Sequence, residues 1–153
     1  MKMTPEERRM YDNFLPGKIS KNGFLGNDAR HIHDIIKMDL HTLSSLGLDK
    51  EVVAERLQWF IEEGKKVLEG EVDLGEFSFE IRWDRGMGPC PFGEPGLYPK
   101  ITAKIVNKDQ KKEMRVSQLG VHMIREHGFF GGKGSVFRLE PAEVVRIIGL
   151  KTE

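Results

Sequence analysis

The spacing of apolar residues changes at Gly70, and this change restricts the fold more than any other feature of the sequence. Before Gly70, apolar residues recur every three or four positions, as they do on one face of a helix. After it, residues 76–83 alternate apolar and polar side chains, as in a strand with one buried face. The pattern predicts an α+β fold in which helices precede a sheet.

Three helices are predicted before Gly70. Thr4–Glu7 reads as a capping box with proline at the first helical position, so a helix should follow it. We expect Asn27 or Asp28 to cap a second helix and Asp49 to cap a third. The apolar stripes expected on the second and third helices are Ile32, Ile35, Ile36, Leu40 and Leu43, and Val53, Leu57, Phe60, Ile61, Gly64 and Leu68.

Three strands are predicted after Gly70, over residues 76–83, 100–107 and 111–116. Glu76 and Glu80 lie on the outward face of the first strand, and Lys100 and Lys104 lie on that of the second. Antiparallel pairing would place these opposite charges side by side on the face open to water. The residues expected to face the core are Phe77, Phe79, Ile81, Trp83, Ile101, Ala103, Ile105, Met114 and Val116. The sheet is therefore predicted as a three-stranded antiparallel meander.

Two further helices are predicted after the meander. Ser117 can cap a helix over residues 118–127, which Gly128 would end, and Pro141 can begin the last helix. Between them, residues 135–139 are expected to be extended. The predicted fold is thus α+β, with N-terminal helices packed on the meander and followed by two helices.

The length of 153 residues fits a single domain, residues 1–153, with a helical part (1–70) and an α+β part (71–153). The alternative is a helical lobe that docks loosely on the second part.

The only cysteine, Cys90, excludes an internal disulfide and favours a reducing, cytoplasmic location. With 24 basic and 24 acidic residues the net charge is zero, so nucleic acid is not an expected partner. No apolar run is long enough for a membrane span.

The segment Asp84–Pro99 is longer than a hairpin connection needs, and long loops of this kind are usually functional or disordered. Its prolines reduce the freedom of the unfolded chain, and its apolar side chains can be buried, so an ordered segment is expected. Two interpretations remain open. The segment is either a lid or pocket wall with Cys90 near its tip, or a packed loop that covers one end of the sheet.

The candidate catalytic groups are Cys90, His122, Glu126 and His127. Cys90 is a nucleophile, a metal ligand or a small buried thiol. His122 and Glu126 are separated by one helical turn, so they could act as a base and the carboxylate that orients it, or form a hydrogen-bonded pair in the core. His127 lies about 140° around the helix from His122, and the two are not expected to bind one ion.

A glycine-rich loop after the fourth predicted helix is a candidate anion site. Its residues are Gly131, Gly132, Lys133, Gly134 and Ser135. Consecutive glycines let backbone amides converge on an anion, and a lysine adds charge. The spacing matches neither a P-loop nor a dinucleotide fingerprint, and a simple turn is the alternative.

Three polar residues on the second predicted helix also need an explanation. His31 and Asp34 are weak candidates for metal ligands, since they are three residues apart on one helix face. Asp39 falls within the apolar stripe, where an unpaired carboxylate would be costly. We expect Asp39 to cap a loop, ahead of a salt bridge to an arginine or a role in a site.

These observations favour a small cytoplasmic protein that binds an anionic small molecule. The binding site is expected between the 84–99 loop, the 118–127 helix and the 131–135 loop, because these irregular segments flank the helix that carries the His–Glu pair.

Two other functions are kept as alternatives. The first is a metal-assisted or thiol-based hydrolase that uses Cys90 with His122 or His127. The second is an interaction module that forms a homodimer through Trp59, which shares with Val52 the side of the third predicted helix opposite its apolar stripe.

Overall fold

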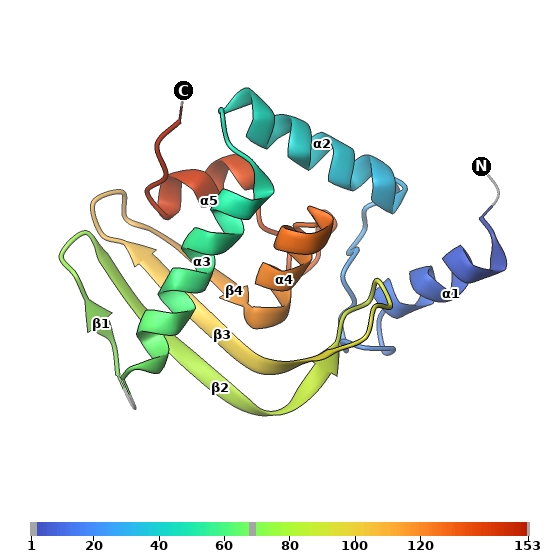
Figure 1. The fold of residues 1–153 in the computed structure, drawn as a ribbon, viewed down its shortest axis with the longest axis horizontal. Coiled ribbons are helices and arrows are strands. Elements are labelled where there is room, and N and C mark those ends of the chain that lie inside the picture. The colour runs from blue at the N-terminus through green and yellow to red at the C-terminus, as the bar shows by residue number, and fades with distance from the viewer. Residues whose placement is uncertain (1–2, 68–69, 153) are drawn as a thin grey trace.

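The structure is a computed structural model that describes residues 3–67 and 70–152. The strands form one antiparallel sheet in the order β1-β2-β3-β4 (Figure 1). This confirms the α+β class and the meander, to which the two-residue strand β1 is added. In chain order the elements are α1 (Pro5–Phe14), α2 (Ile32–Ser45), α3 (Lys50–Lys65), β1 (Val72–Asp73), β2 (Phe77–Pro89), β3 (Leu97–Asn107), β4 (Lys112–Ser117), α4 (Gln118–His127) and α5 (Pro141–Ile147).

The predicted caps of α1 and α3 are confirmed. The Thr4 hydroxyl accepts a hydrogen bond from the Glu7 amide at 3.1 Å, and the Asp49 carboxylate accepts one from the Val52 amide at 2.9 Å. Each bond satisfies an amide that the first helical turn would otherwise leave without a partner.

The predicted cap of α2 was wrong. His31, rather than Asn27 or Asp28, caps this helix, and its Nδ1 accepts the His33 amide at 3.1 Å. The Asp28 carboxylate is used elsewhere, because it binds the Arg30 side chain. The helix therefore begins at Ile32, after a longer connection than the sequence suggested.

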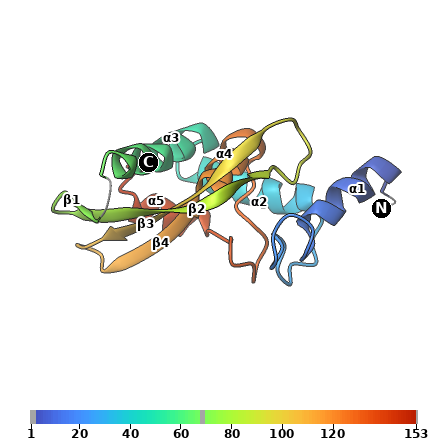
Figure 2. The same cartoon turned by 90° about the horizontal axis from the view of Figure 1, so that it is seen from below.

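One face of the sheet is covered by α3, α4 and α5, and α2 packs against α5 (Figures 1 and 2). On the opposite face, Glu80 stands beside Lys104 in the register of β2 and β3, as predicted.

Trp83 was expected in the core, but 63% of it is exposed. It lies next to the C-terminal end of α3, where the ammonium of Lys65, the last residue of that helix, is 5.9 Å from its ring.

Two hydrophobic clusters stabilise the fold. The larger, which we call the main core, lies between the sheet and the helices that cover it. Both parts of the chain contribute to it, since Leu43 and Phe60 pack there with Ile105. The smaller, which we call the secondary core, consists of Phe14, Phe24, Ile32, Ile35, Cys90, Met123 and Phe129.

Asp39 is buried and forms a two-pronged ion pair with Arg138, with N–O distances of 2.6 and 3.0 Å. The expectation of a loop cap was therefore wrong, and the arginine alternative is the one observed. Arg138 also donates to the Gly131 carbonyl at 2.9 Å. Charge pairing and hydrogen bonding together compensate the burial of this carboxylate, and they join α2 to the segment after α4.

Residues 135–138 form a turn where the sequence predicted an extended piece over 135–139. The Ser135 hydroxyl accepts from the Phe137 amide, and the Ser135 carbonyl accepts from the Arg138 amide, at 3.1 Å each. These local bonds take the place of strand pairing.

Leu68, predicted on the apolar face of α3, lies outside the described residues. In the described ranges, no helix combines the length and the hydropathy needed to cross a membrane.

Val52 and Trp59 are 38% and 36% exposed, and the Trp59 ring is 4.7 Å from the Arg56 guanidinium. A dimer through Trp59 stays a prediction.

Candidate metal centre

The segment between Asp84 and Pro99 is mostly a β-ribbon, so the expectation of a long irregular loop was wrong. Pairing of β2 with β3 resumes at Met87 after an irregularity and continues to Pro89, opposite Leu97. Gly86 has a φ of 92° at this irregularity, a conformation that favours glycine. Prolines are tolerated in a two-stranded ribbon, because a nitrogen on the side away from the partner strand needs no hydrogen to donate.

Residues 90–96 form the tip of the ribbon and lie against α4 and α1 (Figure 1). The Gly93 amide donates to the Cys90 carbonyl at 3.1 Å, which closes a tight turn. The Asn13 side chain of α1 donates to the Pro91 carbonyl at 3.2 Å. These hydrogen bonds fix the tip, which folds over α4.

Helix α4 supplies two histidines to this contact. Ser117 caps the helix, with its hydroxyl accepting the Gly120 amide at 2.9 Å, and Gly128 ends it. His122 lies in the middle of the helix and His127 is its last residue. The predicted bounds of this helix are confirmed.

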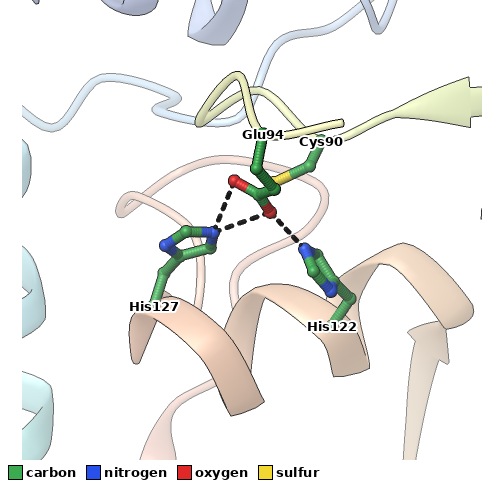
Figure 3. Close-up of side chains that lie close together, drawn as sticks. All are labelled: Cys90, Glu94, His122 and His127. Carbon is green, nitrogen blue, oxygen red and sulfur yellow. Dashed lines mark hydrogen bonds and ion pairs between the residues drawn. The ribbon is translucent and has the colours of Figure 1, made fainter. Parts of the chain in front are cut away.

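The tip and α4 bring four side chains together, as Figure 3 shows. Glu94 reaches from the tip, where Oε1 contacts His122 Nε2 and the two carboxylate oxygens lie 2.9 and 3.0 Å from His127 Nε2. The Cys90 thiol is beside them. One donor atom from each residue lies within 4.8 Å of the other three.

Aromatic side chains of the ribbon hold both imidazoles in place. Phe92 stacks on His127 with ring centroids 3.9 Å apart. Tyr98 packs on His122 at 4.3 Å, and its hydroxyl is 3.2 Å from His122 Nε2. Packing of this kind restricts ring rotation, so that both Nε2 atoms stay directed at Glu94.

Exposure to solvent differs across the cluster. Cys90 is only 2% exposed, whereas the side chains of His122, His127 and Glu94 are 13%, 23% and 31% exposed. The thiol therefore forms the floor of the cluster, and the carboxylate lies at its open edge.

The two acidic groups shift in opposite directions. Burial raises the pKa of Cys90 to about 12, with a further contribution from its hydrogen bond to Glu94. Burial would also raise the pKa of Glu94, but hydrogen bonds from His127, His122 and Cys90 outweigh it and lower this pKa to about 2. Without a metal, the cluster at neutral pH thus contains a carboxylate and a protonated thiol.

This donor set suits zinc. Thiolate, imidazole and carboxylate bind Zn²⁺ at about 2.0–2.3 Å, so that neighbouring donors in a tetrahedron are roughly 3.3–3.7 Å apart. The observed limit of 4.8 Å needs only small side-chain movements to reach that geometry. Thiolate and imidazole together do not suit Mg²⁺ or Ca²⁺, which prefer oxygen ligands.

The pairing that the sequence predicted on α4 was wrong. His122 pairs with Glu94 rather than with Glu126, which is exposed. His122 and His127 do converge, with ring centroids 5.7 Å apart. The 140° between them on the helix is bridged because both long side chains lean toward the carboxylate at the tip of the ribbon.

Glu94 was missed by the sequence reasoning, which considered Cys90 alone in this segment. A usable signal was present, because Glu94 follows Cys90 by four residues in a turn-forming stretch. Two donors so close together can face the same ion from one turn. The cluster also brings Cys90 to both histidines that were proposed as its partners.

The glycine-rich loop lies against the segment before α2 rather than in this cluster. The Gly132 amide donates to the Phe24 carbonyl at 2.8 Å, and the Lys133 amide donates to the Asp28 carboxylate at 3.1 Å. A Cβ on Gly132 would lie 2.2 Å from the Leu25 carbonyl oxygen, so the close approach requires glycine. These amides already have partners, and the anion site proposed over Gly131–Ser135 stays a prediction.

His31 and Asp34 are separate from the cluster as well. His31 caps α2, and Asp34 is exposed in the first turn of that helix. In the described part of the chain, the group formed by Cys90, Glu94, His122 and His127 is the only one in which three or more such donors meet.

Comparisons with protein-family models, with curated proteins and with solved structures find no match. The functional argument therefore depends on the geometry of the cluster.

Proposed function

We propose that this chain is a zinc-binding protein in which one Zn²⁺ ion joins the ribbon tip to α4. The observation that carries the proposal is the meeting of four donors of zinc-binding chemistry within 4.8 Å. They come in two pairs, Cys90 with Glu94 and His122 with His127, from segments that are otherwise separate in the chain. Binding would release the proton of Cys90, because the metal ligand is the thiolate, and each imidazole would bind through Nε2 with its ring proton on Nδ1.

A structural role for the ion follows from the number of donors. Structural zinc sites use four protein ligands, whereas catalytic sites keep one position for water or substrate. The floor of the cluster, Cys90, belongs to the secondary core, so the ion would stabilise that region. The cysteine ligand needs a reduced thiol, and a cytoplasmic location is therefore part of this proposal.

Metal-assisted hydrolysis is the second candidate, and the exposure of Glu94 favours it. If this 31% exposed carboxylate moved aside, Cys90, His122 and His127 would hold the ion and water would take the fourth position. Glu94 could then accept a proton from that water. A thiol nucleophile is disfavoured, because Cys90 is buried and its pKa is raised.

The proposal is tested by measuring zinc in the protein purified without chelator and by replacing zinc with Co²⁺. We expect about one zinc per chain, and absorption from a tetrahedral thiolate–Co²⁺ site. Cys90→Ser should remove the sulfur-to-cobalt band, and His127→Gln should reduce the metal content at least tenfold. Glu126→Gln is the matched control, since it alters an exposed neighbour on α4 and should retain the metal.

Two results would contradict zinc binding: less than a tenth of an equivalent in the wild type with no cobalt spectrum, or equal zinc content in Cys90→Ser. A hydrogen-bonded network that holds no metal would give the first of these two results.

The catalytic candidate is separated by assaying the zinc-loaded protein on nitrophenyl esters. Glu94→Gln should lower metal-dependent hydrolysis at least tenfold if Glu94 is the base, and the absence of metal-dependent hydrolysis would exclude this chemistry for these esters.

A further inference from the structure

A pocket of about 340 Å³ lies beside the candidate metal centre, where β3 meets the start of α4. Five consecutive residues of β3, from Tyr98 to Thr102, line it. The connection between α1 and α2 forms one wall through Ile19 and Phe24, and Leu119 of α4 lies at the far side. Figure 2 shows that this connection and the segment after α4 lie on the same side of the sheet.

The pocket has an apolar interior. Phe24 is buried, and its ring stacks on Phe137 with centroids 4.9 Å apart. Ile101 and Leu119 add aliphatic surface. A hollow of this size, lined by aromatic and aliphatic groups with a few polar ones, is typical of small-molecule sites.

The rim of the pocket is positively charged. Lys21 and Lys100 both line it, and neither takes part in an ion pair with any described residue. Asp84 is the acidic residue at the rim, and its carboxylate lies 3.0 Å from Arg82 Nε. Two ammonium groups without carboxylate partners next to an apolar hollow favour a ligand with an anionic group.

We infer that this pocket binds an aromatic or otherwise apolar small molecule that carries one anionic group, with Lys21 and Lys100 at the anion. Ser20 and Thr102 line the same pocket, and a serine or threonine hydroxyl can donate to an anionic group. The sequence pointed to an anionic ligand near the ribbon and α4, but with the 131–135 loop as the third wall. In the structure, the connection before α2 takes that position.

Tyr98 lines the pocket and also contacts His122 of the metal centre. A ligand against Tyr98 would therefore lie next to the zinc ligands without needing to displace one. The inference stands apart from zinc binding, because it depends on the pocket and its lysines. It can fail or succeed whatever the metal content is.

The test uses two fluorescent probes with nearly the same apolar body, 8-anilinonaphthalene-1-sulfonate and the uncharged N-phenyl-1-naphthylamine. We expect the sulfonate to bind the wild type, and its dissociation constant to rise about tenfold in the double variant Lys21→Gln/Lys100→Gln. Binding of the uncharged probe should change less than twofold. Raising the salt concentration to 1 M should weaken sulfonate binding to the wild type in the same direction.

A second variant blocks the hollow without touching its charges. Gly88 lines the pocket and has no positive φ, and a Cβ at this position would meet no atom within 4 Å, so Gly88→Leu adds a bulky side chain at the pocket without a backbone clash. We expect it to lower the affinity for both probes at least tenfold while the melting temperature is retained. The control double variant Lys37→Gln/Lys151→Gln, which alters two exposed lysines elsewhere, should leave both affinities unchanged.

The inference is overturned if the sulfonate fails to bind the wild type at 1 mM. It is also overturned if sulfonate binding survives both the double lysine variant and Gly88→Leu, since the probe would then bind elsewhere. An equal loss of both probes in the lysine variant would remove the anionic part of the ligand class.

Discussion

The main core and the secondary core are packed in different ways. The main core joins one face of the sheet to the regular faces of α2, α3, α4 and α5. The secondary core gathers aromatic rings from segments with little regular structure, and Phe14 alone makes edge-to-face contacts with Phe24, Phe92 and Phe129. The comparison shows that one region depends on secondary structure, while the other depends on long-range contacts that end at the cluster of Cys90, Glu94, His122 and His127.

The largest effect is expected from a cavity in the main core. Phe60 is fully buried between Phe77 and Phe79, with ring centroids 5.3 and 5.1 Å away. Phe60→Ala should lower the global free energy of unfolding by about 3–5 kcal/mol, measured by urea denaturation. Val52→Ala, at a 38% exposed position of the same helix, should cost less than about 0.5 kcal/mol. Equal losses in the two variants would contradict the assignment of the main core.

A smaller and more local effect is expected in the secondary core. Phe14→Ala should lower the global free energy of unfolding by about 1–3 kcal/mol, since α1 and the ribbon tip can open while the sheet stays folded. Hydrogen exchange should show loss of protection in α1 and unchanged protection in β3. Leu15→Ala, at an exposed neighbour, is the control. Uniform loss of protection across both cores would show that they unfold as one unit.

The smallest effect is expected from the ion pair between Asp28 and Arg30. Hydrogen bonds from Arg30 lower the pKa of Asp28 well below its usual value, and the Lys133 amide adds to this against the opposing effect of burial. A depressed pKa stabilises the fold above the unfolded value of about 3.9, and this stability is lost as pH falls below it. Asp28→Asn should therefore cost about 1.5 kcal/mol at pH 7 and less at pH 3, measured by thermal unfolding at both pH values. A loss that does not change with pH would contradict the ionic contribution.

Much of the fold could be predicted because its signals are local. The caps at Thr4, Asp49 and Ser117 depend on residues within three positions, and all three are confirmed. The alternation that placed Ile101 and Ile105 in the core is a property of the strand itself. The same rule failed at Trp83, because burial also requires a covering helix, and the end of α3 cannot be read from the strand.

The candidate centre could be predicted only in part. Cys90, His122 and His127 were recognised as reactive groups, yet their meeting depends on how far the ribbon extends. Reading Asp84–Pro99 as a loop hid the strand pairing that carries Glu94 across to α4. The partner of Asp39 was likewise out of reach, since Arg138 is distant in the chain and the contact depends on the turn of residues 135–138.

The four residues of the candidate centre are also synthesised at different times, because Cys90 and Glu94 precede both histidines in the chain. Cys90 and Glu94 leave the ribosome 37 and 33 residues before His127, which corresponds to roughly 2–7 s at ordinary translation rates. For that interval the nascent chain presents its thiol to cellular oxidants without the imidazoles that later surround it. Once folded, the same sulfur is almost completely covered. Irreversible oxidation of Cys90 should therefore accumulate in newly made chains rather than in mature ones.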